Sequence, residues 1–168
     1  LLKFYSMNMV AEVGNILPNV VLQWSTEEDS GDFSTNDFFS NKKVVIFAVP
    51  GAFTSTCSKL HVPSYLKHYE KIKLKKVDAI LCISVNDQSV MQAWAKNQKT
   101  EDKIIMISDG NAEFTRLLGL EVDLSQFKMG IRSKRYSMLV DNGCIKFINI
   151  EKNRGIELTG AENMLNQL

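Results

Sequence analysis

The sequence predicts an α/β fold in which a mixed β-sheet is flanked by helices on both faces. Short apolar runs alternate with amphipathic segments over the first two thirds of the chain, which is typical of parallel strands joined by helical crossovers. The last third instead has two apolar runs around Asp141-Asn142-Gly143, which predicts an antiparallel hairpin. The 168 residues fit a single domain, and we expect one that spans residues 1–168.

Strands are expected where apolar residues run together without a helical period. Residues 42–49 are the clearest case, because two lysines are followed by an unbroken apolar run, as in a strand buried on both faces. Residues 25–32 are polar and predict a turn after the first strand. The predicted strands are 19–24, 42–49, 77–85, 104–107, 136–140 and 144–150.

Helices are expected where apolar residues recur every three or four positions. Residues 57–73 contain such a stripe, made of Leu60, Tyr65, Leu66, Tyr69 and Ile72. Residues 87–98 form a second amphipathic helix, in which we expect Trp94 to pack in the core. The turn at Asp109-Gly110 leads into a short helix that ends at Gly119, and a last helix is expected at residues 160–168.

Charge and hydropathy exclude several kinds of partner. Lys+Arg 20 against Asp+Glu 19 gives a net charge of +1, which offers no electrostatic footprint for nucleic acid or for an anionic membrane. The longest strongly apolar stretch, residues 44–49, is closed by Pro50-Gly51 and is far short of the roughly 20 residues that a spanning helix needs. We therefore expect no nucleic-acid partner and no membrane partner.

The cysteines and histidines argue against a disulfide framework and against a metal site. Cys57, Cys82 and Cys144 are widely separated, and the chain has only two histidines. We expect no metal, no cofactor and an intracellular setting. The chain begins at Leu1 rather than Met. We therefore expect a protein of the cytoplasm or of an organelle, plastid-like or mitochondrial, from which a targeting segment has been removed.

The candidate site lies where the strand at residues 42–49 ends, at Pro50-Gly51-Ala52-Phe53-Thr54-Ser55-Thr56-Cys57. A cysteine in the first turn of a helix meets free amide donors and the positive end of the helix dipole, and both favour the nucleophilic thiolate. Thr54 could direct its hydroxyl at that sulfur or at the molecule it attacks. Pro50 has no N–H and could wall off the sulfur without competing for its hydrogen bonds.

The pattern Pro50-x-x-x-Thr54-x-x-Cys57 resembles the active-site motif of the peroxiredoxins, and the residues around it resemble their type II (peroxiredoxin five) branch. Further blocks match in consistent order across roughly residues 10–168, namely Ser84-Val85-Asn86-Asp87, Ser108-Asp109-Gly110-Asn111 and the run from Gly130 to Ser137. The resemblance implies a thioredoxin-like fold and a homodimer. It also implies an enzyme that reduces hydrogen peroxide and small alkyl hydroperoxides in redox homeostasis and antioxidant defence.

The resemblance also assigns roles within the site. Cys57 corresponds to the peroxidatic nucleophile, which becomes a sulfenic acid. Thr54 corresponds to the residue that orients the peroxide, and Arg135 to the arginine that holds sulfur and oxygen together. Pro50 completes the catalytic set. The residues expected to bind substrate are Gly51, Phe53, Thr54, Cys57 and Arg135.

Some type II members carry a second, resolving cysteine after the hairpin, but residues 151–159 of this chain contain none. We therefore expect a one-Cys mechanism, in which an external thiol resolves the sulfenic acid on Cys57. The candidate reductants are glutathione with glutaredoxin, or thioredoxin. Cys82 is expected to be a structural thiol. Cys144 is left open between an inert residue, a resolving thiol and a contact between subunits.

Other interpretations remain at this point. Arg132 competes with Arg135 for the catalytic position, although a surface or dimer contact suits it better. His61 lies one helical turn after Cys57, where packing or an interface is favoured over a general base. A thioredoxin-type electron carrier is disfavoured, because Thr54 stands where its first cysteine would be. The alternative function is a peroxide sensor, or a redox relay or chaperone, that passes oxidation from Cys57 to a partner protein.

Overall fold

The computed structural model describes residues 11–168, so the N-terminal processing expected at Leu1 lies outside the described residues. The strands are β1 Val21–Ser25, β2 Ser30–Ser34, β3 Lys43–Ala48, β4 Ala79–Ser84, β5 Ile105–Ser108, β6 Glu121–Asp123, β7 Ile131–Ser133, β8 Tyr136–Asp141 and β9 Cys144–Ile150. The helices are α1 Thr35–Phe39, the π-helix η1 Cys57–His61, α2 Val62–Lys67, α3 Tyr69–Leu74, α4 Gln88–Gln98, α5 Glu113–Leu117, the 3₁₀-helix η2 Ser125–Phe127 and α6 Ala161–Gln167.

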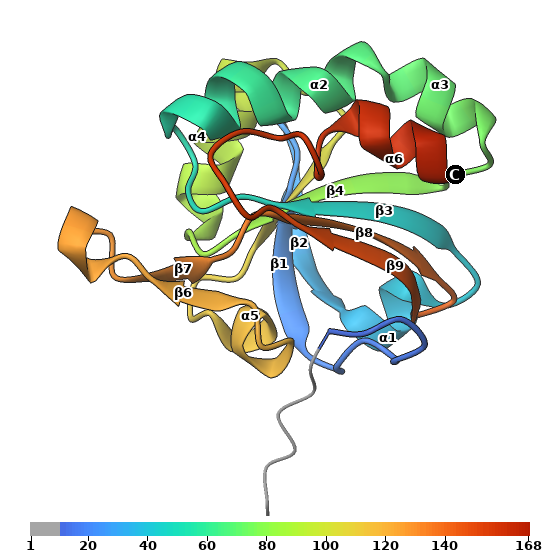
Figure 1. Ribbon diagram of the computed structural model, residues 1–168, viewed down its shortest axis with the longest axis horizontal. Coiled ribbons are helices and arrows are strands. Elements are labelled where there is room, and N and C mark those ends of the chain that lie inside the picture. The colour runs from blue at the N-terminus through green and yellow to red at the C-terminus, as the bar shows by residue number, and fades with distance from the viewer. Residues whose placement is uncertain (1–10) are drawn as a thin grey trace, which may run out of the picture.

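Seven strands form one mixed sheet in the order β2-β1-β5-β4-β3-β8-β9. The three central strands β3, β4 and β5 are parallel, whereas β1, β2, β8 and β9 add antiparallel edges. The predicted hairpin is confirmed, with Asn142 and Gly143 both at positive φ in its turn. β6 and β7 pair separately as a short arm beside the sheet (Figure 1). The predicted mixed sheet with helices is therefore confirmed.

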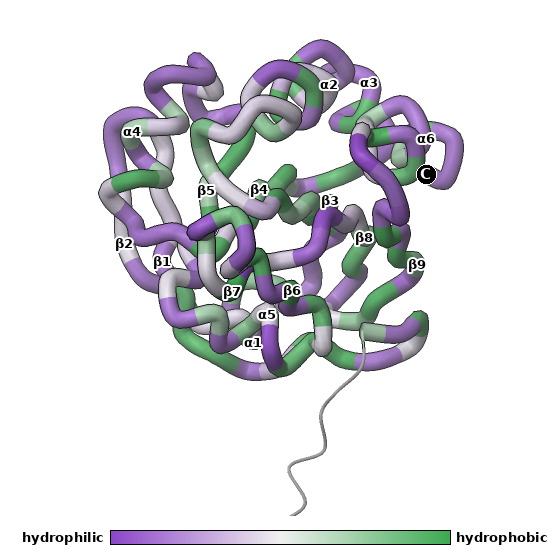
Figure 2. The backbone as a smooth tube through the Cα atoms, turned by 60° about the vertical axis from the view of Figure 1, so that its left-hand side comes forward, coloured by the Kyte–Doolittle hydropathy of each residue, from purple (hydrophilic) through white to green (hydrophobic). Residues whose placement is uncertain are grey.

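Helices cover both faces of the sheet. α2, α3, α4 and α6 lie on one face, and α1 and α5 lie on the other (Figure 1). Alternation along β3 sends Val45 and Phe47 into the core under α2 and α4, and Val44 and Ile46 into the core under α1 and α5. Trp94 is buried in the first of these cores, as expected. In Figure 2, where the tube is coloured by residue hydropathy, hydrophobic residues (green) follow one another along β4, β8 and β9, and hydrophilic residues (purple) are frequent in the outer helices and turns.

Strand register determines which strand ends lie at the same edge of the sheet. The carboxyl ends of β3, β4 and β5 lie along one edge of the sheet, because these strands are parallel and adjacent. β8 runs antiparallel to β3 and places Tyr136 opposite Ala48. The residue just before β8, Arg135, therefore arrives beside the loop that leaves β3. β9 in turn places Ile150 opposite Tyr136, so the segment after β9 begins at the same edge.

The predicted turn at residues 25–32 is partly wrong, because Ser30, Gly31 and Asp32 already belong to β2. These residues are poor strand formers, and their pairing with β1 outweighs their intrinsic preference. Gly31 lies against the Trp24 indole, where an added Cβ would be 2.9 Å from Nε1. The elements α1, β6 and β7 were not predicted either, because each has at most five residues and contains neither an unbroken apolar run nor a helical period.

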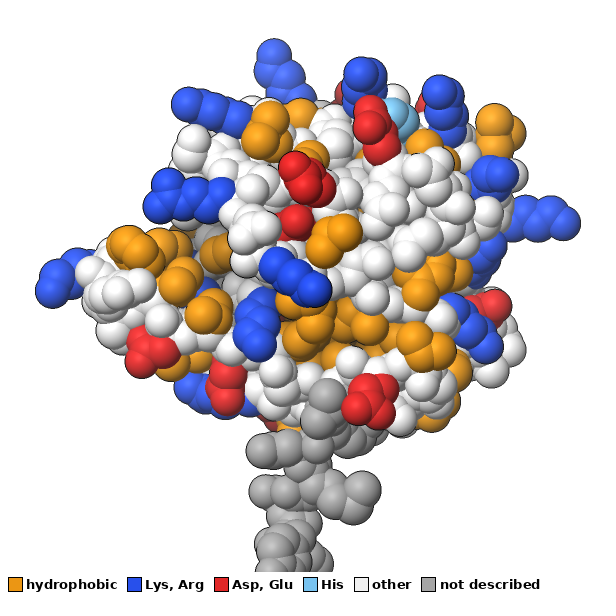
Figure 3. Space-filling view, in the orientation of Figure 1, with side chains coloured by type: hydrophobic (Ala, Val, Ile, Leu, Met, Phe, Trp, Pro, Cys, Tyr) orange, Lys and Arg blue, Asp and Glu red, His pale blue; other side chains and the backbone are white. Residues whose placement is uncertain are grey.

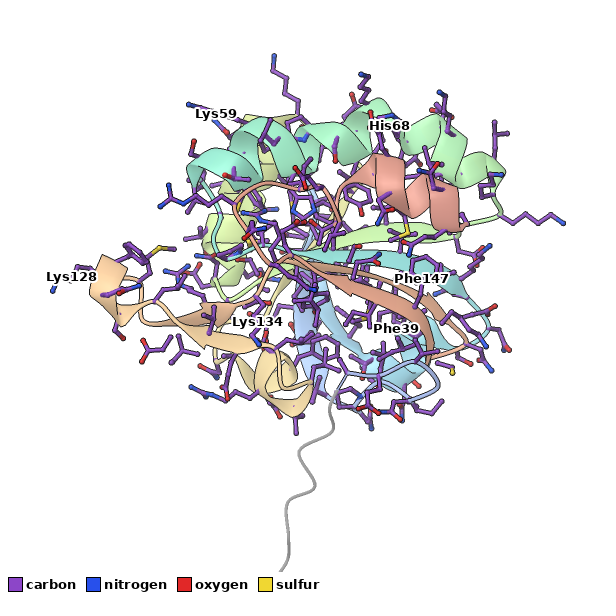
Figure 4. The ribbon with its side chains drawn as sticks, in the orientation of Figure 1. Phe39, Lys59, His68, Lys128, Lys134 and Phe147 are labelled. Atoms are coloured by element: carbon purple, nitrogen blue, oxygen red, sulfur yellow. The ribbon has the colours of Figure 1, made fainter. Side chains whose placement is uncertain are left out.

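The helix predicted at residues 57–73 is broken into η1, α2 and α3. The Val62 amide donates to the carbonyl of Cys57, five residues back, which makes a π turn. Within this turn His61 is fully buried, whereas Leu60 is 50% exposed. Leu60, which the predicted apolar stripe included, therefore does not share the burial of Tyr65 and Ile72. Lys59 points away from the sheet (Figure 4).

The distribution of charge on the surface and the length and hydropathy of the helices can be compared with the sequence. On the face drawn in Figure 3, positive and negative side chains are interspersed rather than gathered by sign. Among residues 11–168, no helix combines the length and the apolar character that crossing a bilayer requires.

Candidate functional site

Cys57 begins the π-helix η1 directly over the carboxyl end of β3. Its side chain is fully buried and packs in the core that contains Phe47 and Val62. Its sulfur accepts a hydrogen bond from the guanidinium of Arg135, at an Nη2–Sγ distance of 3.2 Å. A guanidinium at this distance gives the thiolate both a counter-charge and a directed donor. The structure thus brings together the two residues that the sequence singled out from distant positions.

Arg135 reaches the sulfur with one half of its fork and a second partner with the other half. Its Nη1 atom donates to Nδ1 of His61 at 2.8 Å. Two fixed bonds hold the planar group in one orientation, which a lysine ammonium could not reproduce. Arg132, the competing arginine, bonds elsewhere, with Nε donating to the Met129 carbonyl at 2.9 Å and Nη1 to the Pro50 carbonyl at 3.5 Å. Arg132 therefore lies against the loop rather than on the sulfur.

The loop from Pro50 to Thr54 connects β3 to η1 and is held by one hydrogen bond within the loop and one to another segment. The Ala52 amide donates to Oδ1 of Asn86 at 3.0 Å, which anchors the loop to the segment after β4. The Thr54 hydroxyl donates to the Gly51 carbonyl at 2.7 Å, so its oxygen is left to accept a bond from another group.

Two further positions of this loop were expected to bind substrate. Gly51 is buried so tightly that an added Cβ would lie 3.1 Å from Thr54 Cγ2 and 3.2 Å from Arg132 Nη1. Phe53 has a φ of 62° and a side chain that is 53% exposed. Gly51 therefore lets the loop approach Arg132 closely, whereas Phe53 presents its ring to solvent beside the loop.

His61 is a member of the site that sequence reasoning did not assign to it. It packs in the core against Phe47 and Tyr65, as expected for a buried histidine. Burial, and next the charge of Arg135, lower the pKa of His61 from 6.5 to about 3. The ring is therefore neutral at physiological pH. Its Nε2 lies 3.1 Å from the Thr159 carbonyl, which can only accept, so the proton is on Nε2 and Nδ1 accepts from Arg135.

The buried neutral His61 makes folding sensitive to acid. Between pH 6.5 and about 3 the unfolded chain binds a proton at His61 and the native chain does not, so stability falls as the pH falls through this window. Between about pH 7 and about pH 5, we expect His61 to lower the free energy of unfolding by about 2 kcal/mol. Urea unfolding of the wild type and of His61→Gln at both pH values measures this difference.

The control for this comparison is His68→Gln, at the chain's other histidine. Between the two pH values we expect His61→Gln to lose about 2 kcal/mol less stability than the wild type, and His68→Gln shows what the same replacement does at the other histidine. Equal losses in the wild type and in His61→Gln would contradict the placement of His61.

The other two cysteines occupy different environments. Cys82 lies on β4 opposite Phe47 and is fully buried. Burial raises the pKa of Cys82 well above its usual value, so it stays a thiol. Cys144 begins β9 opposite Asp141, which pairs with Lys43 at the amino end of β3. Cys144 is thus separated from the site by the length of β3, about 16 Å, whereas a disulfide needs Cα atoms within about 7 Å.

Comparison with known proteins identifies the family. The Redoxin family matches residues 12–165. Peroxiredoxin-2C of Oryza sativa is 44% identical over 157 residues, which cover 93% of this chain and 97% of that protein. Chloroplastic Peroxiredoxin-2E of Arabidopsis thaliana is 42% identical over 161 residues, which cover 93% of this chain and 68% of that protein.

Solved structures give the same result. Reduced Prx3 of Vibrio vulnificus in complex with H₂O₂ has a TM-score of 0.87 and 44% identity, and the match covers 93% of this chain and 98% of that chain. The 1-Cys peroxiredoxin of Plasmodium falciparum, an antioxidant protein, has a TM-score of 0.82 and 33% identity, with 91% and 95% covered. The thioredoxin-like fold predicted from the sequence is therefore confirmed. The chain belongs to the redoxin family as a peroxiredoxin of the type II branch, that is, a thiol-dependent peroxidase of antioxidant defence.

Proposed function

We propose that Cys57 is the peroxidatic nucleophile of a one-Cys peroxidase that works as a single domain over residues 1–168. The substrates are hydrogen peroxide and small alkyl hydroperoxides. The observation that carries the proposal is the 3.2 Å bond from Arg135 Nη2 to Cys57 Sγ at the carboxyl edge of the parallel strands. This edge is where ligands bind in open α/β sheets. The Vibrio vulnificus relative, solved with H₂O₂, supports the choice of substrate.

In the first step, the Cys57 thiolate attacks one oxygen of the peroxide. A sulfur–oxygen bond forms as the oxygen–oxygen bond breaks. The sulfur is oxidised by two electrons, and the leaving oxygen takes the bonding pair and a proton to become water or an alcohol. Arg135 holds the sulfur along this path. The Thr54 oxygen, whose own proton is used on Gly51, accepts from the peroxide hydroxyl. Pro50, Gly51 and Phe53 form the loop against which the peroxide is held.

In the second step, an external thiol attacks the Cys57 sulfenic acid. Water leaves, and a mixed disulfide forms. A second thiol then releases Cys57 as a thiol and carries away the disulfide. Two positions support an external donor: Cys144 lies at the opposite end of β3, and Cys82 is held as a buried thiol. Because Cys57 is fully buried, a thiol reaches it when η1 opens locally.

The reductant that we propose is glutathione with glutaredoxin, or thioredoxin, and the working unit that we propose is a homodimer. Exposed Phe53 and Leu60, 53% and 50% accessible on either side of Cys57 in the chain, support a second copy near the site. The compartment that we propose is the cytoplasm or an organelle. The chloroplastic relative from Arabidopsis thaliana supports the organelle.

The one-Cys mechanism predicts that turnover does not depend on Cys144. We expect Cys144→Ser to retain most of the peroxidase rate with glutathione and glutaredoxin or with thioredoxin, because the thiol that resolves Cys57 is supplied from outside. Steady-state consumption of hydrogen peroxide by the wild type and by Cys144→Ser measures this. A rate that collapses in Cys144→Ser, while its melting temperature is unchanged, would identify Cys144 as the resolving residue and overturn the proposal.

A further inference from the structure

The segment after β9, residues 151–160, passes from the sheet to the helix layer that contains α2 and α6 (Figure 1). It begins with Glu151, whose amide donates to the Arg135 carbonyl at 2.9 Å. The Glu151 carboxylate accepts from the amides of Leu158 and Thr159, both at 3.1 Å to Oε2, and from the Thr159 hydroxyl at 3.0 Å. A single carboxylate thus closes the segment into a loop and fixes the orientation of Thr159.

The loop is tied to the site through the Thr159 carbonyl. This carbonyl accepts from His61 Nε2 at 3.1 Å and from the Tyr65 hydroxyl at 2.8 Å. Thr159, His61 and Tyr65 are all fully buried. A carbonyl has two lone pairs, and here two side chains from the helices above use them. The carbonyl therefore has a defined position relative to the His61 ring.

Two neighbours together determine which nitrogen of His61 carries the proton: the Thr159 carbonyl at Nε2, which can only accept, and the Arg135 guanidinium at Nδ1, which can only donate. A neutral imidazole has one N–H, and the Thr159 carbonyl can only accept. With the proton on Nε2, the Nδ1 atom is an acceptor for Arg135 Nη1 at 2.8 Å. In the other tautomer, Nδ1 would carry a hydrogen directed at a guanidinium hydrogen. Arg135 would then lose the bond between Nη1 and His61. This is the bond that fixes the guanidinium in the orientation in which Nη2 donates to the Cys57 sulfur.

We propose that Glu151 is a positioning residue for the chemistry of Cys57. By binding the Leu158 and Thr159 amides, it places the Thr159 carbonyl, which selects the His61 tautomer that holds Arg135 on the sulfur. The proposal rests on the proposed function, since it takes Cys57 as the reacting group. Glu151 itself does not touch the sulfur, and its effect on the site passes through Thr159, His61 and Arg135.

The first test is the reaction rate of Cys57 in Glu151→Ala. We expect the second-order rate constant with hydrogen peroxide to fall by about ten- to a hundred-fold, because Arg135 is no longer fixed and a small misplacement of a catalytic group has effects of this size. Glu151→Asp keeps the charge but is one methylene shorter. It should therefore fold at least as well as Glu151→Ala and show a smaller fall in the same rate constant. The matched control is Glu157→Ala, at an exposed glutamate of the same segment, which should react like the wild type.

The second test reports on His61 without any peroxide. Imidazole nitrogen-15 chemical shifts distinguish the two tautomers. The chain has two histidines, so a His68→Gln background leaves only the His61 ring to assign. We expect the Nε2–H tautomer alone in the wild type and in Glu157→Ala, and a mixture of tautomers in Glu151→Ala and Glu151→Asp. A merely structural role of Glu151 would lower the melting temperature without changing the tautomer.

The outcomes separate this proposal from the proposed function. A folded Glu151→Ala or Glu151→Asp protein with the wild-type tautomer and the wild-type rate would overturn the positioning role. If Cys57 of the wild type does not react with peroxide, the proposed function fails, and the tautomer in the Glu151 variants still decides whether Glu151 positions His61.

Discussion

Replacing Cys57 with Ser is expected to lower kcat/KM for hydrogen peroxide by about a thousand-fold or more, the range in which enzymes lose activity when a nucleophile is removed. A serine hydroxyl is a far weaker nucleophile than a thiolate at neutral pH. It also cannot form the sulfenic acid through which the proposed cycle proceeds. Stopped-flow consumption of hydrogen peroxide, with external thiol in excess, measures the loss.

The structure provides the controls for this variant. Serine is close to cysteine in size, and Cys57 is fully buried, so a melting curve must show that Cys57→Ser is folded. Cys144→Ser changes the same atom at the opposite end of β3 and should keep the wild-type rate. A folded Cys57→Ser protein that still turns over peroxide would show that the chemistry lies elsewhere.

Replacing Arg135 with Lys is expected to lower kcat/KM by about a hundred- to a thousand-fold, the usual effect of removing one preorganised donor from an active site. Lysine retains the positive charge, but it cannot donate at the same time to Cys57 Sγ and to His61 Nδ1, as the two halves of the guanidinium do. The second-order rate constant of the reduced enzyme with hydrogen peroxide isolates this step from the later reaction with thiols.

Two neighbouring basic residues serve as controls for Arg135. Lys134→Met alters an exposed cation next to Arg135 in the chain (Figure 4) and should leave the rate constant unchanged. Arg132→Lys alters the guanidinium that bonds the Met129 and Pro50 carbonyls and should have a smaller effect than Arg135→Lys. If Arg132→Lys lost as much as a hundred-fold and Arg135→Lys lost little, the two arginines would have been assigned the wrong way round.

The parts of the fold that the sequence predicted are those with a strong local signal. β3 and β4 are unbroken apolar runs, and the β8–β9 turn has Asn-Gly at the two positions that require positive φ. β2 was missed because Ser30, Gly31 and Asp32 have low strand propensity and are extended through their pairing with β1. No local pattern carries that information.

The site shows the same division between local motif and tertiary contact. The motif from Pro50 to Cys57 is contiguous, so the loop and the nucleophile could be placed from the sequence. His61 could not be assigned to Arg135, because the two residues are 74 positions apart in the sequence and only the tertiary fold brings the guanidinium to the ring. Glu151 is a single carboxylate whose partners, Leu158 and Thr159, are defined only once the loop closes.

The central claim is that Cys57 forms a sulfenic acid that waits for an external thiol. Intact mass after brief treatment of the reduced wild type with one equivalent of hydrogen peroxide, with and without dimedone, tests it most directly. The account predicts a rapid dimedone adduct that maps to Cys57 and no loss of two hydrogens. Loss of two hydrogens with a Cys57–Cys144 or Cys57–Cys82 link, or a Cys57 that reacts no faster than free cysteine, would contradict it.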